Sequence, residues 1–256
     1  MTASGGGDDA LPVVDARATA EAFRADLRRA GARDSADLDE VVTGVVDAYA
    51  DPRRRYHDLR HLAEVREALH SVSAPHPADD AAVLAAWFHD VVHGSSRDAS
   101  PAPSLAPSLE VSELDAVAGD DASDEALSAE VARRDLTRLG LDPRLVDLVA
   151  DLVDATATHR VPDGLAGDTR GVRAAQALLD ADLWILSAPA DRFDAYCAQV
   201  RAEYAFVDDA TYAAARTDIL RDLARRPRFY LTAEAQATWT RPARANLARE
   251  LDRLRA

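Results

Sequence analysis

The chain has 256 residues and a formal net charge of −15, with 48% hydrophobic and only 5% aromatic residues. This length suffices for a hydrophobic core that folds without stabilising cross-links. The single cysteine, Cys197, excludes internal disulfides, iron–sulfur clusters and thiolate zinc sites. Because all 30 basic residues are arginine, lysine-dependent phosphate loops, Schiff-base chemistry and lysine bases are also excluded.

The acidic balance argues against general binding to nucleic acid or to anionic membranes, although a local arginine cluster could still bind a small phosphorylated molecule. No apolar stretch approaches membrane-spanning length, and the polar residues 1–10 lack the hydrophobic run of a signal peptide. We therefore expect a cytoplasmic protein without a membrane partner. No feature of the sequence specifies an oligomeric state.

Residues 1–14 are predicted to form a flexible tail and residues 15–256 one all-α domain, because helical periodicity dominates and no segment alternates convincingly. The segment Gly94–Ser123 carries several prolines and serines but few large apolar groups, which indicates a mobile insertion that could act as a lid. The pair Asp142-Pro143 is typical of a helix start. The predicted helices span residues 15–30, 36–50, 58–72, 78–93, 124–139, 143–158, 171–187, 190–207, 209–225 and 240–255.

Projection at 100° per residue separates inward from outward side chains in the predicted helix 58–72. His61 lies on its apolar face, and His57 lies one turn earlier. His70 falls on the opposite face, toward solvent. His61 is therefore a candidate ligand, whereas His70 is not.

The predicted helix 78–93 is apolar almost all round, so we expect it to be central and to deliver His89-Asp90 from its buried end. A carboxylate buried beside a histidine is costly unless it is paired or metal-bound. Histidine nitrogen and carboxylate oxygen together suit a borderline divalent cation, and open positions would allow a metal-activated water.

Asp180 and Asp182 are two positions apart, which on a regular helix separates them by about 200°. Asp182 falls in the middle of the apolar face, and Asp180 falls opposite. We therefore expect Asp182 to be a metal ligand. Asp180 is expected either to position the ligands without binding the ion or to face solvent.

Three further polar residues lie on inward stripes of predicted helices: Glu125, His159 and Arg216. Each also has a structural interpretation, as a helix-start carboxylate, a core histidine or an ion-pair partner. The same alternative applies to Arg201. Their occurrence together with the candidate ligands nevertheless favours a common site.

The ordered set His61, His89, Asp90 and Asp182 resembles the four-ligand pattern of the HD superfamily, named for its histidine–aspartate doublet. More closely, the chain resembles a bacterial family described as predicted metal-dependent HD phosphohydrolases, over about residues 40–255. It departs from that family at His93, where a tyrosine is expected, and in its long insertion. The matching stretches are Tyr49–His57, Ala85–Val92, Ser123–Ala129, Leu179–Leu183, Val200–Tyr204, Arg216–Leu220, Phe229–Thr232 and Ala243–Leu247.

The resemblance implies a helical HD fold and metal-dependent hydrolysis of a phosphate ester, such as that of a nucleotide. One divalent ion (Mn, Fe, Zn, Ni, Co or Mg) would be held by the four ligands, with Glu125 or His57 as the acid–base group. The expected substrate contacts are Arg201, Arg216, His159 and Asp180.

Two alternatives remain at this level. The chain could be a catalytically silent HD domain that binds a nucleotide or metal and acts as a sensor or interaction module. A carboxylate-bridged di-iron bundle would rest on the single motif Glu67-Ala-Leu-His70, whose histidine is predicted to face outward.

Overall fold

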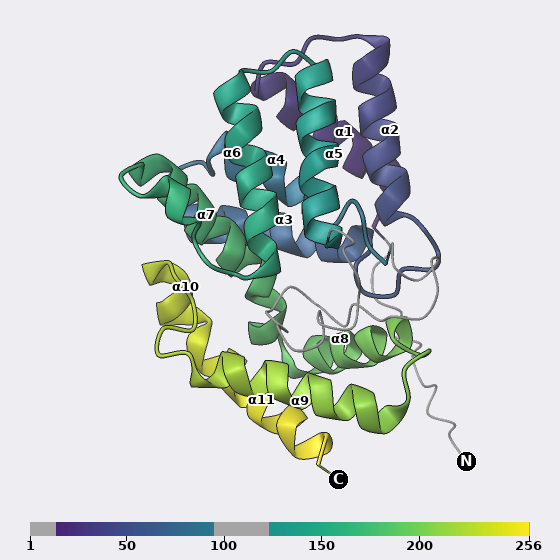
Figure 1. Ribbon diagram of the computed structural model, residues 1–256, viewed down its shortest axis with the longest axis vertical. Coiled ribbons are helices and arrows are strands. Elements are labelled where there is room, and N and C mark those ends of the chain that lie inside the picture. The colour runs from purple at the N-terminus through teal and green to yellow at the C-terminus, as the bar shows by residue number, and fades with distance from the viewer. Residues whose placement is uncertain (1–13, 95–122, 256) are drawn as a thin grey trace, which may run out of the picture.

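The computed structural model describes residues 14–94 and 123–255, and every regular element there is helical, which confirms the predicted all-α class for these ranges (Figure 1). The predicted tail and the predicted insertion lie outside the described residues except at their edges. No helix in the described ranges is long and apolar enough to cross a lipid bilayer. The helices are α1 (Ala16–Arg29), α2 (Ala36–Tyr49), α3 (Leu59–Ser73), α4 (Asp80–Phe88), α5 (Asp124–Arg138), α6 (Pro143–Asp154), α7 (Thr169–Asp182), α8 (Ala190–Glu203), α9 (Asp209–Arg225), α10 (Ala233–Thr238) and α11 (Thr240–Arg253), with 3-10 turns η2 (Ala155–Ala157), η3 (Asp163–Leu165) and η4 (Leu183–Ser187).

The helices form two groups joined by α7 and η4 (Figure 1). In the first group α5 packs against α6, and α3 packs against α7. In the second group α11 packs against α9 and η4, and α8 also contacts η4. The carboxyl end of α7 therefore lies at the boundary between the groups, where both can contribute side chains to one site.

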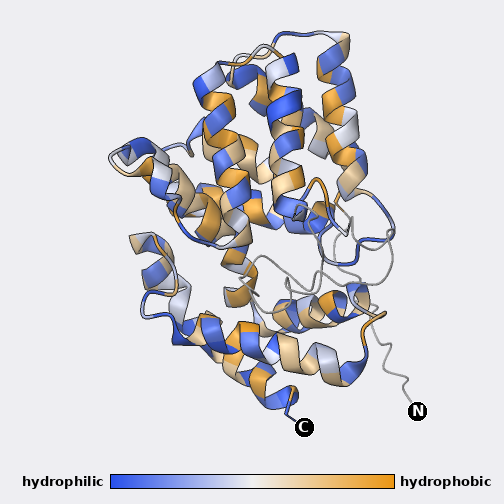
Figure 2. Ribbon diagram, viewed as in Figure 1, coloured by the Kyte–Doolittle hydropathy of each residue, from blue (hydrophilic) through white to orange (hydrophobic). Residues whose placement is uncertain are grey.

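Helix α4 is the centre of the first group. All its residues from Ala81 to Phe88 are buried, as its continuous apolar sequence predicts. It packs against α1, α3, α5, α6 and α7. The surrounding helices α5 and α6 are amphipathic, with hydrophilic and hydrophobic residues alternating around each helix (Figure 2). The central position of α4 brings its carboxyl end, which carries the doublet, into the interior.

Side chains that bind free backbone N–H groups fix several helix starts. Asp58 accepts hydrogen bonds from the backbone N–H groups of Arg60 and His61, and this sets the first turn of α3. Asp142 caps α6, with Pro143 at its first position, so the predicted start of this helix is confirmed.

Helix α4 ends at Phe88 rather than at residue 93, because side chains from elsewhere bind the backbone that follows. Arg54 donates to the carbonyl oxygens of Asp90 (2.7 Å) and Val91 (2.9 Å). The Tyr49 hydroxyl accepts the N–H of Asp90 at 3.1 Å. These contacts replace the next turn of helix and turn Asp90 toward the site.

The predicted helix 171–187 is also interrupted, since α7 ends at Asp182 and continues as η4. Asn246 of α11 donates from Nδ2 to the carbonyl oxygens of Leu186 (2.9 Å) and Ala188 (2.8 Å), which draws this turn toward the second group. The six-residue helix α10 was not predicted, because it is too short to show a helical period.

Candidate functional site

The four predicted ligands converge at the buried end of α4. His61 comes from α3, His89 and Asp90 follow α4, and Asp182 ends α7; all four are buried. His61 Nε2 lies 3.1 Å from His89 Nε2, 3.2 Å from Asp90 Oδ2 and 3.4 Å from Asp182 Oδ1. His89 Nε2 lies 3.1 Å from Asp90 Oδ2 and 3.5 Å from Asp182 Oδ1. We call these residues the HD cluster.

The spacing of the HD cluster fits a shared cation. Ligand atoms bonded to one ion at about 2.0–2.2 Å lie roughly 3–3.5 Å apart when they are adjacent. The Nε2 and carboxylate oxygen atoms of the HD cluster are 3.1–3.5 Å apart. His61, His89 and Asp90 also form one of two groups in the described residues whose ligand atoms are close enough to hold a metal ion.

The tautomer of His89 supports the same conclusion. Its Nδ1 lies 3.0 Å from the carbonyl oxygen of Ala86, which can only accept, so Nδ1 must carry a proton. In the neutral ring Nε2 is then an unprotonated acceptor that faces the oxygens of Asp90 and Asp182. Two acceptors repel at this distance unless a proton or a metal ion lies between them. A ligand histidine fixed through its other nitrogen is the usual arrangement at metal sites.

Electrostatics in the HD cluster favours positive charge. Burial alone would lower the pKa of His61, but hydrogen bonds with Asp182 and Asp90 raise it to about 9. Burial opposes ionisation of Asp90 and Asp182, yet the charge of His89 and hydrogen bonds from the histidines hold the pKa of both carboxyls well below the ordinary value. The carboxylates therefore stay ionised and attract either protons on the histidines or a metal ion.

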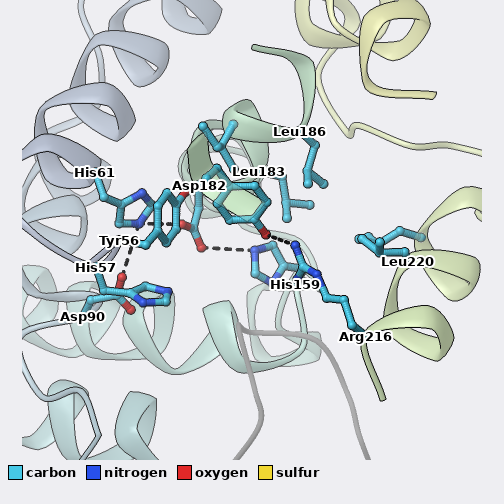
Figure 3. Close-up of a pocket in the computed structure, with 13 residues that line it drawn as sticks. Tyr56, His57, His61, Asp90, His159, Asp182, Leu183, Leu186, Arg216 and Leu220 are labelled. Atoms are coloured by element: carbon cyan, nitrogen blue, oxygen red, sulfur yellow. Dashed lines mark hydrogen bonds and ion pairs between the residues drawn. The ribbon is translucent and has the colours of Figure 1, made fainter. Parts of the chain in front are cut away.

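A small cavity of about 40 Å³ adjoins the HD cluster (Figure 3). His61, Asp90 and Asp182 border one side of it, and Arg216 of α9 reaches it from the second helix group. The rest of the wall combines aliphatic side chains with His57, His159 and two tyrosines. The lining residues are Tyr56, His57, His61, Asp90, His159, Asp182, Leu183, Ile185, Leu186, Tyr196, Arg216, Leu220 and Leu223.

Arg216 is a buried cation whose charge the protein does not compensate. Its NH2 donates to the hydroxyl of Tyr196 at 2.6 Å, and its Nε has no hydrogen-bond partner. No carboxylate in residues 14–94 or 123–255 forms an ion pair with it. Because burying an unpaired charge is costly, this guanidinium is suited to an anion in the cavity.

His159 also lies where the sequence predicts, facing inward beyond the end of α6. A positive φ of 51° at His159 turns the chain, and its Nε2 lies 3.1 Å from Asp182 Oδ2. Asp182 therefore contacts the HD histidines through Oδ1 and His159 through Oδ2. The Nδ1 of His159 is buried without a partner.

His57 lines the cavity and is held by a residue that the sequence analysis missed, Glu203 of α8. His57 Nδ1 and Glu203 Oε2 are 2.7 Å apart. Glu203 occupies the buried stripe formed with Phe193, Tyr196 and Val200, at spacings of three, four and three. The test that selected Glu125 would therefore have found Glu203 as well.

The structure does not bring three predicted residues to the cavity. Arg201 closes the turn after α8: it donates to the carbonyl oxygens of Tyr204 (2.7 Å) and Val207 (2.9 Å) and pairs with Asp209 (2.6 Å). Its donors are thus committed to the fold, and a phosphate contact is not supported.

Asp180 and Glu125 are buried but lie outside the cavity lining. Asp180 is not solvent-facing: its oxygens accept hydrogen bonds from the N–H groups of Leu231 and Thr232, both at 2.7 Å. Burial raises the pKa of Glu125, and the charge of Asp90 acts in the same direction. His70 is exposed, as predicted, so the E-x-x-H motif of the di-iron alternative lies on the outer face of α3, away from the buried ligand clusters.

Comparisons of the chain with protein-family models, with curated proteins and with solved structures found no match in any of the three.

Proposed function

We propose that this protein is a metal-dependent phosphohydrolase of the HD type, which cleaves a small phosphate ester in the cavity beside the HD cluster. One observation carries the proposal: the uncompensated guanidinium of Arg216 borders the same cavity as three of the four candidate ligands, His61, Asp90 and Asp182. A cation site and a separate anion-binding arginine facing one small space suit a phosphoryl group, which binds both.

His61, His89, Asp90 and Asp182 would hold the divalent ion, and their mixed nitrogen and oxygen donors are compatible with Mn, Fe, Zn, Ni, Co or Mg. When bound, such an ion supplies an acidified water and withdraws charge from a phosphoryl oxygen. His89 is held in the required tautomer by the Ala86 carbonyl oxygen, so the chain prepares the site before any ligand arrives.

Arg216 would bind the phosphoryl oxygens through its free N–H groups. The Tyr196 hydroxyl, 2.6 Å from NH2, fixes the orientation of the guanidinium without neutralising it. The apolar side chains of Leu183, Leu186 and Leu220 limit water beside this charge pair (Figure 3). Exclusion of water strengthens the attraction between the guanidinium and the phosphoryl group.

His57 is the residue best placed to move a proton. Its Nδ1 is committed to Glu203, so Nε2 is the ring nitrogen that remains for the substrate or the attacking water. Glu203 is itself anchored, because its Oε1 accepts the backbone N–H groups of Arg55 (2.8 Å), Tyr56 (3.0 Å) and His57 (3.2 Å). A carboxylate that fixes the ring and tautomer of a histidine is a recurrent arrangement for acid–base catalysis.

The cavity limits the part of the substrate that is enclosed. Its volume of about 40 Å³ corresponds to roughly three water-sized spaces. This accommodates a phosphoryl group and an attacking water, so the rest of a larger ester, such as a nucleoside, would extend out of the cavity.

The test is phosphate release across a panel of phosphomonoesters and nucleotides, measured on protein stripped with a chelator and then reloaded with each divalent metal. We expect turnover of at least one small ester, dependent on metal and lowered by about 10²–10³-fold in Arg216→Met. An Arg201→Met variant provides the control, since this arginine lies outside the cavity. Metal-loaded protein that binds phosphate but hydrolyses no ester would instead identify a silent HD domain that acts as a sensor.

A further inference from the structure

A second cluster of potential ligands lies beside the HD cluster. It consists of His57, His93 and Glu203, whose side chains are 6%, 7% and 0% exposed. The rings of His57 and His61 are 5.6 Å apart between centroids, so the two clusters adjoin, yet they share no residue. His57, His93 and Glu203 form the other group in the described residues whose ligand atoms are close enough to hold a metal ion.

His93 is the member that the protein itself leaves unsatisfied. Its Nε2 is buried and makes no hydrogen bond, and it lies 3.6 Å from Glu203 Oε2. Its ring packs against that of His57, with 4.0 Å between centroids. Buried polar atoms are rarely left without a partner, so an unsatisfied ring nitrogen directed at a carboxylate points to a missing ligand.

Glu203 is arranged to present one oxygen to both histidines. Its Oε1 is occupied by three backbone N–H groups, from Arg55, Tyr56 and His57. Its Oε2 is left for His57 Nδ1 at 2.7 Å and His93 Nε2 at 3.6 Å. A carboxylate anchored through one oxygen while the other binds is the pattern found around ligating carboxylates.

We propose that His57 Nδ1, His93 Nε2 and Glu203 Oε2 form a second metal site, of the class that binds zinc or a similar borderline divalent ion. Two imidazoles and one carboxylate are a known zinc-binding set that leaves a fourth position open. At bond lengths of about 2.0–2.1 Å such ligand atoms lie roughly 3.3–3.4 Å apart. The observed separations of 2.7 and 3.6 Å lie on either side of that value, so small side-chain rotations suffice.

Binding an ion here removes the proton shared by His57 and Glu203, which passes to solvent. The ring of His57 then carries its proton on Nε2, the nitrogen left for the cavity. This proposal does not depend on the proposed hydrolase activity, because it concerns occupancy rather than turnover.

The experiment counts ions. Full-length protein is stripped with a chelator and titrated with Zn²⁺ by calorimetry, with elemental analysis after removal of free metal. We expect two Zn²⁺ per chain in the wild type. His93→Phe keeps an aromatic ring but lacks a ligand atom, and Asp182→Asn changes the HD cluster and its contact with His159 but leaves the second cluster intact. Each variant should bind one ion. The double variant should bind none.

Glu203→Gln provides a second way to remove the site, since glutamine keeps an oxygen for the three backbone N–H groups but loses the charge. His70→Gln is the matched control, because it removes an exposed histidine and should leave both ions bound. Circular dichroism verifies that each variant is folded. If the wild type binds one ion that Asp182→Asn abolishes and His93→Phe retains, or if His93→Phe still binds two, the second site does not exist.

Discussion

The two helix groups differ in how the charges that they bring to the candidate site are paired. In the first group each ionised side chain of the HD cluster faces an opposite or titratable partner within 3.5 Å. In the second group Arg216 is buried, and the Tyr196 hydroxyl is its hydrogen-bond partner in place of a carboxylate. The first group therefore holds a balanced set of ligands, and the second presents a positive charge that still lacks its anion.

Within the second group, Arg201 and Arg216 differ in whether their N–H groups already have partners in the protein. Both were candidates for phosphate binding, and both stack on tyrosine rings, at 4.8 Å from Tyr212 and 5.1 Å from Tyr196. The N–H groups of Arg201 bind two carbonyl oxygens and Asp209. The Nε–H of Arg216, in contrast, has no partner, and this side chain lines the cavity. The partners of an arginine, rather than its place on a helix face, thus decide whether it is available to a substrate.

The largest expected effect comes from removing a carboxylate ligand from the HD cluster. Asp182→Asn should remove the ion of the HD cluster and lower turnover by more than about 10³-fold, since metal-bound water and charge withdrawal are lost together. Asp180→Asn should keep that ion, because Asp180 binds Leu231 and Thr232, and should instead cost about 1–3 kcal/mol of stability. Metal analysis and thermal unfolding of both variants test this, and loss of metal in Asp180→Asn would contradict it.

The next effect separates the two acid–base candidates. His57 lines the cavity and Glu125 does not. His57→Gln should therefore lower kcat by about 10²–10⁴-fold while the HD cluster keeps its ion. Glu125→Gln should change kcat by less than about tenfold. If the two variants rank in the reverse order, Glu125 is the group that moves the proton, as its inward position on α5 first suggested.

The elements of this fold that the sequence predicted well are those decided by local pattern. The apolar helix around Leu84, the cap at Asp142 and the inward faces of His61 and Asp182 all follow from periodicity and from helix-start chemistry. The projection placed Asp182 and Asp180 on different faces, and the two do contact different groups, but Asp180 is buried rather than solvent-facing.

What sequence reasoning missed depends on contacts between distant segments. The early end of α4 requires Arg54, and the break after Asp182 requires Asn246, 64 positions later in the chain. The anchoring of residues 55–57 by Glu203 likewise joins two segments that have no local signal in common. Such tertiary hydrogen bonds override the periodicity of a single helix.

A smaller effect tests the contrast between the two arginines. Arg216→Met should lower kcat/KM by about 10²–10³-fold, the range for losing one preorganised donor. Since it also removes an unpaired buried charge, it should leave stability unchanged or raise it by about 1–3 kcal/mol. Arg201→Met should do the opposite, keeping kcat/KM and lowering stability by about 1–2 kcal/mol. Steady-state kinetics and urea unfolding measure both, and equal losses of activity would refute the distinction.

The smallest effect concerns the surface ion pair that Asp194 forms with Arg249 and Arg253. These charges are fully compensated, in contrast to that of Arg216. Hydrogen bonds from Arg253 and Arg249 lower the pKa of Asp194 from its ordinary value of 3.8 to about 2. Because the folded-state pKa is depressed, the stabilisation is present above the unfolded value and is lost as pH falls through about 4 toward 2. The pair is exposed, so Asp194→Asn should cost only about 0.5–1 kcal/mol at pH 7. Unfolding of wild type and variant from pH 7 to pH 2 should show this difference shrinking in that interval, and a difference that stays constant to pH 2 would mean that Asp194 acts through packing rather than charge.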